Sequence, residues 1–174
     1  MRAAVYERTG KAGDVLRVTD VERPEPGPGE VRVRVMVSGV NPTDYKSRSG
    51  ATGRPFDGFQ VPHHDGAGVV DAVGEGVDGS RIGQEVWVWM AATRRWGTAA
   101  QWTVVPSERA VALPPGTSMD LGASLGVPAM TAHRCLNADG PVRVHRCWSL
   151  AGRGRSGISP SSWPVTAGRG SRRR

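Results

Sequence analysis

The sequence has little cysteine and no long apolar run, and these two absences exclude several classes of protein. Its 174 residues include only two cysteines, Cys135 and Cys147, too few for a disulfide framework or a four-cysteine zinc site. No stretch approaches the roughly 18 apolar residues of a membrane span. Charged side chains are spread through the first twenty residues, which leaves no apolar core for a signal peptide. We therefore expect a reduced, cytoplasmic protein with no membrane partner.

Lysine is also scarce, with two residues against 21 arginines, and the formal net charge of +7 is not evenly distributed. Up to residue 143 the chain has 16 basic and 16 acidic residues, whereas residues 144–174 have seven arginines and no acidic residue. The composition predicts a globular domain over residues 1–143 and a basic segment over 144–174 that is too poor in apolar residues to fold alone. A basic tail can bind nucleic acid through phosphate contacts. This one has no aromatic-basic platform, so we expect no nucleic-acid partner.

The first 110 residues have the pattern of short β-strands. Valines alternate with arginine and methionine over residues 31–37, a period of two that puts one face of a strand on a core and leaves the other partly wet. Similar runs are separated by turns rich in glycine and proline, at residues 1–6, 15–21, 66–73, 85–90 and 99–105. We expect a mostly β fold with a few short helices, in the form of a partly open barrel.

Helix signals are fewer. Asn41 is a good N-cap and is followed by proline, which predicts a short helix over residues 43–49. A second helix is expected from Met119. Pro128 interrupts it, and a third is expected over residues 129–136.

Residues 74–79 match the G-x-G-x-x-G spacing of dinucleotide-binding turns. That motif works where a helix begins, because the N-terminal amides of the helix hold the pyrophosphate. Here another strand-like run follows, and Glu75 and Asp78 would repel phosphate. The segment therefore predicts a hairpin turn, not a nucleotide site.

Three segments, taken in their order and spacing, carry a resemblance to a known family. They are SGVNPTD at 38–44, VPHHDGAGVV at 61–70 with GEGV after it at 74–77, and GVPAMTAH at 126–133. The chain resembles the N-terminal, GroES-like catalytic domain of medium-chain dehydrogenases/reductases, in the zinc-free quinone oxidoreductase (zeta-crystallin-like) branch. The resemblance covers residues 1 to about 143 and implies a GroES-like, partly open β-barrel.

The resemblance implies transfer of hydride from NADPH to a small-molecule quinone or enone-type carbonyl, without metal. The protein would position the acceptor and stabilise the negative charge that develops on its oxygen. By matching positions, the implied catalytic residues are Asn41, Asp44 and Tyr45, and the implied cofactor-binding residues are Asn41 and Thr131. Related enzymes often place their tyrosine one residue later, where this chain has Lys46.

Each of these residues also has a purely structural interpretation. Asn41 can be only an N-cap, Asp44 only a partner of the helix dipole in the first turn, and Tyr45 only a packed surface aromatic. Thr131 can simply follow a helix start broken by proline. The sequence leaves both sets of interpretations open.

A catalytic zinc needs about three protein ligands of the Cys, His or Asp type. In the zinc alcohol dehydrogenases of this superfamily, a cysteine ligand stands where this chain has Asn41. His64 and Asp65 stand at the Gly-His-Glu motif of those enzymes, and residues 91–99 replace their cysteine-rich structural lobe. We expect no metal site, with His63 and His64 serving in packing or hydrogen bonding. A fragment of a zinc-type alcohol dehydrogenase is the alternative.

The segment after residue 143 departs from the family, which continues into a strand, a G-x-G-x-x-G turn and a helix. The excess of arginine indicates a GC-rich gene. With G or C at the free third bases, the codons of residues 146–171 can be read in a shifted frame as VLVAGGAGAVGHLAVQLARHGGARV. One base lost just after codon 143 reproduces the change.

We therefore expect the Rossmann domain of the family to be missing and residues 144–174 to be an out-of-frame, disordered tail. NADPH binding and activity are not expected of this chain alone. Related enzymes often dimerise through the missing domain, so the oligomeric state stays open. A non-catalytic barrel with a nucleic-acid-binding basic tail is the further alternative.

Overall fold

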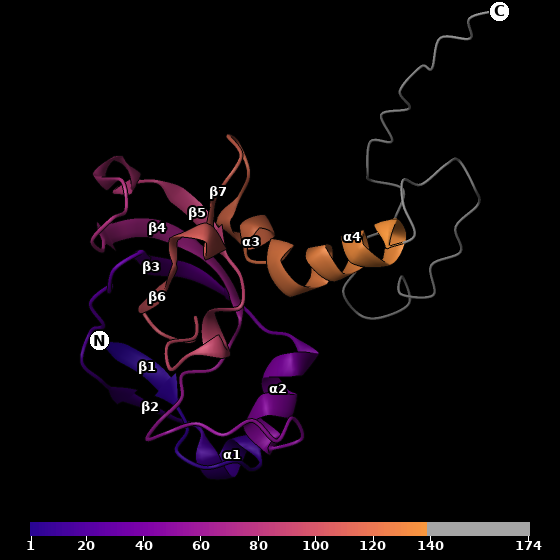
Figure 1. The fold of residues 1–174 in the computed structure, drawn as a ribbon. Coiled ribbons are helices and arrows are strands. Elements are labelled where there is room, and N and C mark those ends of the chain that lie inside the picture. Colours follow the sequence, from indigo (N-terminus) through magenta and orange to yellow (C-terminus); the bar gives the residue numbers. More distant parts are fainter. Residues whose placement is uncertain (139–174) are drawn as a thin grey trace, which may run out of the picture. The chain divides into compact units, whose positions relative to one another are not determined.

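The computed structural model describes residues 1–138, in which the main element is one curled antiparallel sheet (Figure 1). Within these residues its two edge strands do not pair with each other, which leaves the barrel partly open, as the sequence predicts. The expected boundary at residue 143 and the basic segment after it lie outside the described residues. The strand order is β6-β3-β4-β5-β7, with β3 (Glu30–Gly39), β4 (Asp65–Val73), β5 (Glu85–Val88), β6 (Trp102–Pro106) and β7 (Ala110–Ala112).

A two-stranded antiparallel hairpin and several short helices complete the described part. The predicted helices at α2 and α4 are confirmed, and Pro128 lies in a π-type turn between α3 and α4. Neither α1 nor β7 is predicted, because elements of three or four residues carry too little periodicity. The elements are β1 (Arg2–Val5), α1 (Ala12–Val15), β2 (Arg17–Asp20), α2 (Pro42–Ser49), η1 (Gly79–Arg81), η2 (Ala91–Thr93), η3 (Ser107–Arg109), α3 (Met119–Gly122), η4 (Leu125–Ala129) and α4 (Met130–Asn137).

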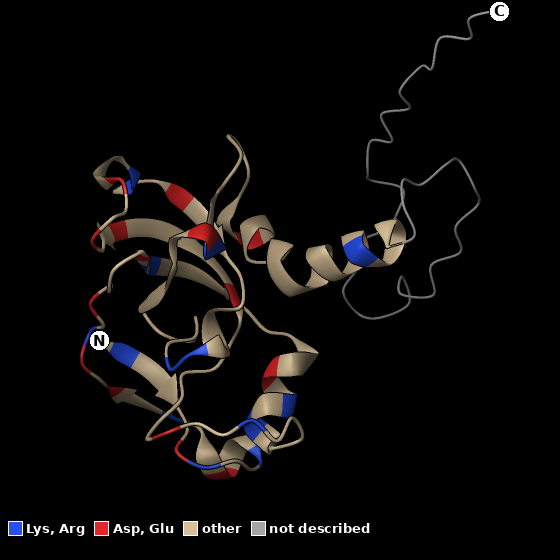
Figure 2. Cartoon of the chain, viewed as in Figure 1, with Lys and Arg blue, Asp and Glu red and all other residues tan. Residues whose placement is uncertain are grey.

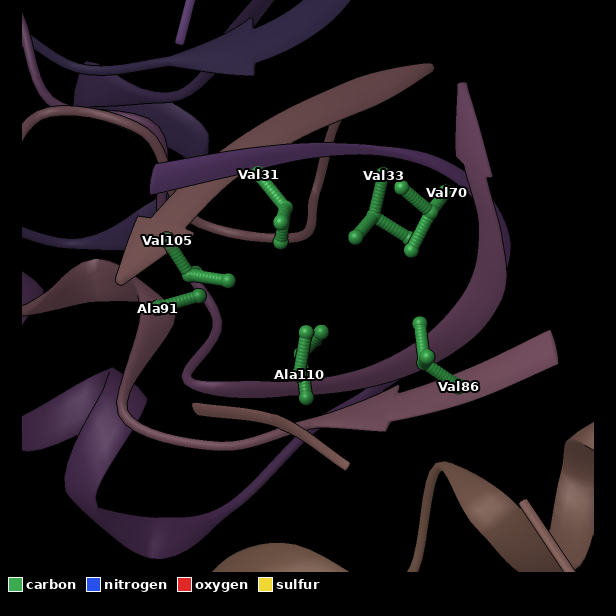
Figure 3. Close-up of a cluster of buried hydrophobic side chains, with 8 residues drawn as sticks. Val31, Val33, Val70, Val86, Ala91, Val105 and Ala110 are labelled. Carbon is green, nitrogen blue, oxygen red and sulfur yellow. The ribbon is translucent and has the colours of Figure 1, made fainter. Parts of the chain in front are cut away.

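The core inside the curled sheet is made of valine and alanine side chains (Figure 3). Val31 and Val33 of β3 are completely buried, while Val35 and Val37 are only partly so. The register of β3 against β4 shifts after Arg32 and again between Val35 and Val37. Such bulges bend a strand and interrupt its strict alternation.

Arg32 is the buried exception on the second face of β3, where Arg34 and Met36 are exposed and the expected partly wet face is confirmed. It is only 6% exposed, and its guanidinium donates to Asp71 Oδ1 at 2.8 Å and to Glu25 Oε1 at 2.6 Å. The indole N–H of Trp102 donates to the other oxygen of Asp71 at 2.8 Å. A buried charge must be paired, and the partners of Arg32 come from other elements. The network therefore joins β3, β4, β6 and the proline-rich segment before β3. Alternation alone could not indicate those partners.

Residues 74–79 lie between the antiparallel strands β4 and β5, and the three-residue turn η1 begins at the last of them, Gly79. The prediction that this G-x-G-x-x-G segment is a hairpin turn is therefore confirmed. Gly74 is needed for packing, since a Cβ atom there would lie 1.8 Å from the carbonyl oxygen of Gly27.

Basic and acidic residues are interspersed along the described part of the chain (Figure 2), in keeping with the balance of charge up to residue 143. Within residues 1–138, no helix has the length and apolar character needed to cross a membrane.

The close approach of β3 and β4 yields a test of the fold. A Cβ atom on Gly68 would lie 2.1 Å from the carbonyl oxygen of Arg34, whereas one on Gly79 would meet nothing within 4 Å. We expect Gly68→Ala to lower the free energy of unfolding by about 3 kcal/mol, since the two strands must separate. The matched control Gly79→Ala should change it by less than about 1 kcal/mol. Urea unfolding followed by tryptophan fluorescence measures both, and equal effects would contradict the register.

Candidate functional site

The chain turns from β3 into α2 at Asn41, which occupies the N-cap with extended backbone angles of −124° and 159°. Asp44 closes a capping box, its Oδ2 accepting the backbone N–H of Asn41 at 2.6 Å. Both side chains are buried, with 7% and 4% exposure. Asn41 therefore stands at the N-cap and Asp44 in the first turn of the helix, as expected, while their roles toward a ligand stay predictions.

Asn41, Asp44, His64 and Asp65 form a cluster of buried polar side chains. Asp65, the first residue of β4, lies at its centre and is completely buried. Its Oδ2 accepts two hydrogen bonds, from Asn41 Nδ2 at 2.8 Å and from the backbone N–H of Val127 at 2.7 Å. A Cβ atom on Gly126 would lie 2.2 Å from Asp65 Oδ1, so only glycine lets η4 come this close. One carboxylate thus links β4, α2 and η4.

Burial disfavours the charged form of every titratable group in this cluster. It raises the pKa of Asp44 to about 6, with the neighbouring Asp65 adding to the rise and the N–H groups of Asn41 and His64 opposing it. It also raises the pKa of Asp65, against the hydrogen bonds from Val127 and Asn41. Burial lowers the pKa of His64 and that of its neighbour His63.

Two buried side-chain polar atoms of the described residues lack a hydrogen-bond partner, and both belong to this cluster. They are His64 Nδ1 and Asp65 Oδ1. The backbone N–H of His64 is bonded, donating to Asp44 Oδ1 at 3.1 Å. Because buried polar atoms are almost always paired, the two unpaired atoms make this the best candidate functional site among residues 1–138.

A hollow open to solvent lies beside α2, with an empty volume of about 390 Å³ when the open space is included. Tyr6 and Phe56 form one wall, their rings meeting edge to face at 5.1 Å. Asp44, His63 and His64 bring the polar cluster to the same hollow, and Arg54 adds a positive charge. The arrangement offers aromatic contact and polar groups for a small ligand.

The structure does not bring all the predicted site residues together. Tyr45 follows Asp44 on α2 but lies at the surface, 55% exposed. Thr131 is exposed on α4, which extends from η4 away from the sheet (Figure 1). Neither residue lines the hollow. Their roles toward an acceptor and a cofactor stay predictions.

The groups around position 41 are bonded to one another. Asn41 turns its amide nitrogen to Asp65, and both oxygens of Asp44 accept backbone N–H groups. Residues 1–138 contain no group of three or more His, Cys, Asp or Glu side chains that could hold a metal ion. The amide nitrogen of Asn41 and both oxygens of Asp44 are therefore already bonded, while His64 Nδ1 and Asp65 Oδ1 stay unpaired.

A dinucleotide fits the described residues only in part. A pyrophosphate needs a glycine-rich turn that opens a helix, and the G-x-G-x-x-G turn within residues 1–138 leads into β5 instead. Residues 1–138 therefore do not provide such a turn for the phosphates of a dinucleotide.

Sequence reasoning missed the central position of Asp65 and its contact with Gly126. A signal was present in the sequence, because Asp65 is the first residue of a glycine-rich strand that is expected to be buried, and a buried carboxylate needs hydrogen-bond donors. Those donors come from residues 24 positions before it and 62 after it, and spacing alone does not pair such distant residues.

The raised pKa of Asp44 predicts a pH effect on stability. Its native pKa of about 6 exceeds the ordinary value of 3.8, so the native state holds the proton more tightly than the unfolded state. This carboxyl therefore lowers the free energy of unfolding as pH rises from about 4 to about 6. Asp44→Asn should remove that fall, while the loss of an accepting oxygen lowers stability at every pH.

His63 and His64 act in the opposite direction, since their lowered pKa values destabilise the native state as the pH falls below 6.5. The difference between the wild-type and Asp44→Asn curves isolates Asp44, because these histidines are present in both. Urea unfolding between pH 4 and pH 8 measures it. Parallel curves would show that Asp44 has its ordinary pKa.

Comparison with known proteins places this geometry in a family. The model of the alcohol dehydrogenase GroES-like domain matches residues 27–115. The chain is 32% identical over 147 residues to the quinone-oxidoreductase homolog, chloroplastic, of Spinacia oleracea, covering 83% of this chain and 44% of that protein. It is 32% identical over 139 residues to the quinone oxidoreductase of Lama guanicoe, covering 76% and 41%.

Among solved structures, a mycobacterial protein in complex with NADPH superimposes with a TM-score of 0.71 at 30% identity. The match covers 82% of this chain and 42% of that one. This chain thus spans less than half the length of the relatives it matches. The family model covers half of the chain and the curled sheet agrees with its fold, so the chain belongs to the alcohol dehydrogenase GroES-like domain family, as a relative of the medium-chain quinone oxidoreductases.

Proposed function

We propose that this chain provides the substrate side of an NADPH-dependent, zinc-free reductase acting on quinones or enone-type carbonyls. The observation that carries the proposal is the hydrogen bond from Asn41 Nδ2 to Asp65 Oδ2. Asn41 stands where the zinc alcohol dehydrogenases of this superfamily have a cysteine ligand, and its amide nitrogen already donates to Asp65. The relatives named as quinone oxidoreductases support the choice of acceptor.

In the proposed reaction, NADPH supplies a hydride when it is bound. One hydride and one proton convert a quinone to a hydroquinone, or add across the conjugated double bond of an enone. The residues of this chain bind and orient the acceptor. Tyr6 and Phe56 can contact its ring, and the bonds of Asp65 hold η4 against α2. Asn41, Asp44 and Tyr45 are the proposed catalytic residues, with Asn41 and Thr131 toward the cofactor.

We extend the proposal to the end of the sequence. The shifted-frame reading of residues 146–171 contains the glycine-rich turn that residues 1–138 do not provide for a pyrophosphate. We propose that a frameshift after codon 143 separates the substrate side from the nucleotide-binding domain. The 174-residue chain is then inactive by itself.

Restoring one base after codon 143 tests the function and the frameshift together. The restored protein should bind NADPH with micromolar affinity and oxidise it, at 340 nm, in the presence of a 1,4-naphthoquinone. The 174-residue chain should do neither, because in this proposal its codons after 143 are out of frame for the strand, turn and helix that hold a pyrophosphate. Isothermal titration calorimetry and the absorbance assay measure the two properties.

Metal content distinguishes the alternative reaction class. Turnover by the restored protein should persist in excess EDTA, and elemental analysis should find no stoichiometric zinc. One zinc per chain with loss of turnover in the chelator would instead favour a zinc-type alcohol dehydrogenase. Micromolar NADPH binding by the 174-residue chain would refute the frameshift proposal.

A further inference from the structure

A line of hydrogen bonds runs from His63 into the sheet. His63 Nδ1 lies 2.9 Å from Ser38 Oγ, which lies 2.9 Å from Thr98 Oγ1. Thr98 Oγ1 in turn lies 2.5 Å from the backbone carbonyl oxygen of Asp65. The line therefore ends on a group that can only accept.

This ending fixes the direction of every bond in the line. A carbonyl oxygen has no proton, so Thr98 must donate its single hydroxyl proton to Asp65. Thr98 can then only accept a hydrogen bond from Ser38. Because the hydroxyl proton of Ser38 is donated to Thr98, Ser38 can only accept a hydrogen bond from His63. The Nδ1 atom of His63 must carry hydrogen. Because burial lowers the pKa of His63, the ring is neutral at pH 7, and its Nε2 atom has a lone pair and no proton.

That lone pair is not used within the described residues. His63 is partly buried and lines the hollow beside α2, and its Nδ1 edge is turned to Ser38. No hydrogen bond joins Nε2 to another atom of residues 1–138. His64 lines the same hollow with its own buried, unpaired Nδ1. His63 and His64 thus line the hollow that Tyr6 and Phe56 also line, and each has an imidazole nitrogen without a hydrogen-bond partner among residues 1–138.

The backbone of His63 is held in an unusual conformation. Its φ of 75° lies in the left-handed region, which residues with a side chain rarely adopt. The carbonyl oxygen of His63 accepts the backbone N–H of Thr98 at 3.0 Å. Thr98 therefore takes part in the line of side-chain hydrogen bonds and also bonds the backbone of His63. Strained residues of this kind cluster at ligand-binding positions.

We propose that the hollow beside α2 binds an aromatic ring carrying a hydroxyl group, and that His63 Nε2 accepts the hydrogen bond from that hydroxyl. The aromatic wall provides contact for the ring, and the fixed tautomer of His63 selects a donor over an acceptor. The hollow is open to solvent, so the ring can lie across its mouth without being enclosed. The choice of a hydroquinone as the occupant rests on the proposed function, of which it would be a product.

The test uses the 174-residue chain and needs no turnover. In long-range ¹H–¹⁵N spectra of the histidine rings, His63 should show a protonated Nδ1 and an unprotonated Nε2. Hydroquinone added under argon should shift Nε2 of His63 and leave the exposed His133 unchanged. The matched ring 1,4-dimethoxybenzene, which has no hydroxyl proton, should cause a far smaller shift.

Two variants separate the side chain from the fold. His63→Gly suits the positive φ, so the chain should fold, and its dissociation constant for hydroquinone should rise about tenfold on losing one hydrogen bond. Ser38→Ala removes the acceptor of Nδ1–H and should populate the other tautomer of His63.

An unprotonated Nδ1 in the free chain, equal responses to the two rings, or unchanged affinity in His63→Gly would each overturn the proposal. These outcomes are independent of the quinone reductase assay on the restored protein. Absence of NADPH oxidation there, with the His63 responses intact, would refute the proposed reaction and leave the hydroxyl-binding pocket in place.

Discussion

The burial of one carboxylate, that of Asp65, is the constraint on which the rest of the site depends. A buried carboxylate is costly unless donors surround it. Its Oδ2 takes them from Asn41 on one side and Val127 on the other. These two bonds draw the start of α2 and the turn η4 onto the first residue of β4, and Gly126 removes the one side-chain atom that would prevent the contact. The positions of Asn41, Asp44 and His64 follow from this arrangement.

The same segment of backbone serves two sets of groups. The side chain of Asp65 organises the α2 side, while its carbonyl oxygen ends the line that orients the ring of His63 through Thr98 and Ser38. The hollow is therefore shaped by fixed hydrogen bonds and by the contact of Tyr6 with Phe56. A group held in this way costs little further ordering when a ligand binds, which is the basis of preorganisation.

The sequence predicts most of the fold and only part of the site. Alternation, prolines and glycines locate the strands, the helix at Asn41 and the turn at residues 74–79, because these signals are local. Alternation fails at Arg32, whose partners Glu25 and Asp71 lie 7 and 39 residues away. The same limit hides Asp65, whose donors lie 24 and 62 residues away. Motif resemblance brought Asn41 and Asp44 to attention, but their burial and bonding required the structure. No sequence pattern indicates the tautomer of His63, which depends on three hydroxyl and carbonyl groups meeting in space.

Asn41 and Asp65 are chemically coupled, and this coupling bears on the choice between zinc and zinc-free chemistry. Asp65 Oδ2 needs a donor from position 41, and an amide supplies one without adding charge. A cysteine there would offer only a weak S–H donor, and as a thiolate it would put a second negative charge beside a buried carboxylate. Only a cation placed between them would relieve that repulsion. Exchanging Asn41 for a metal ligand would therefore remove one of the two donors to Asp65 Oδ2 and leave only the backbone N–H of Val127.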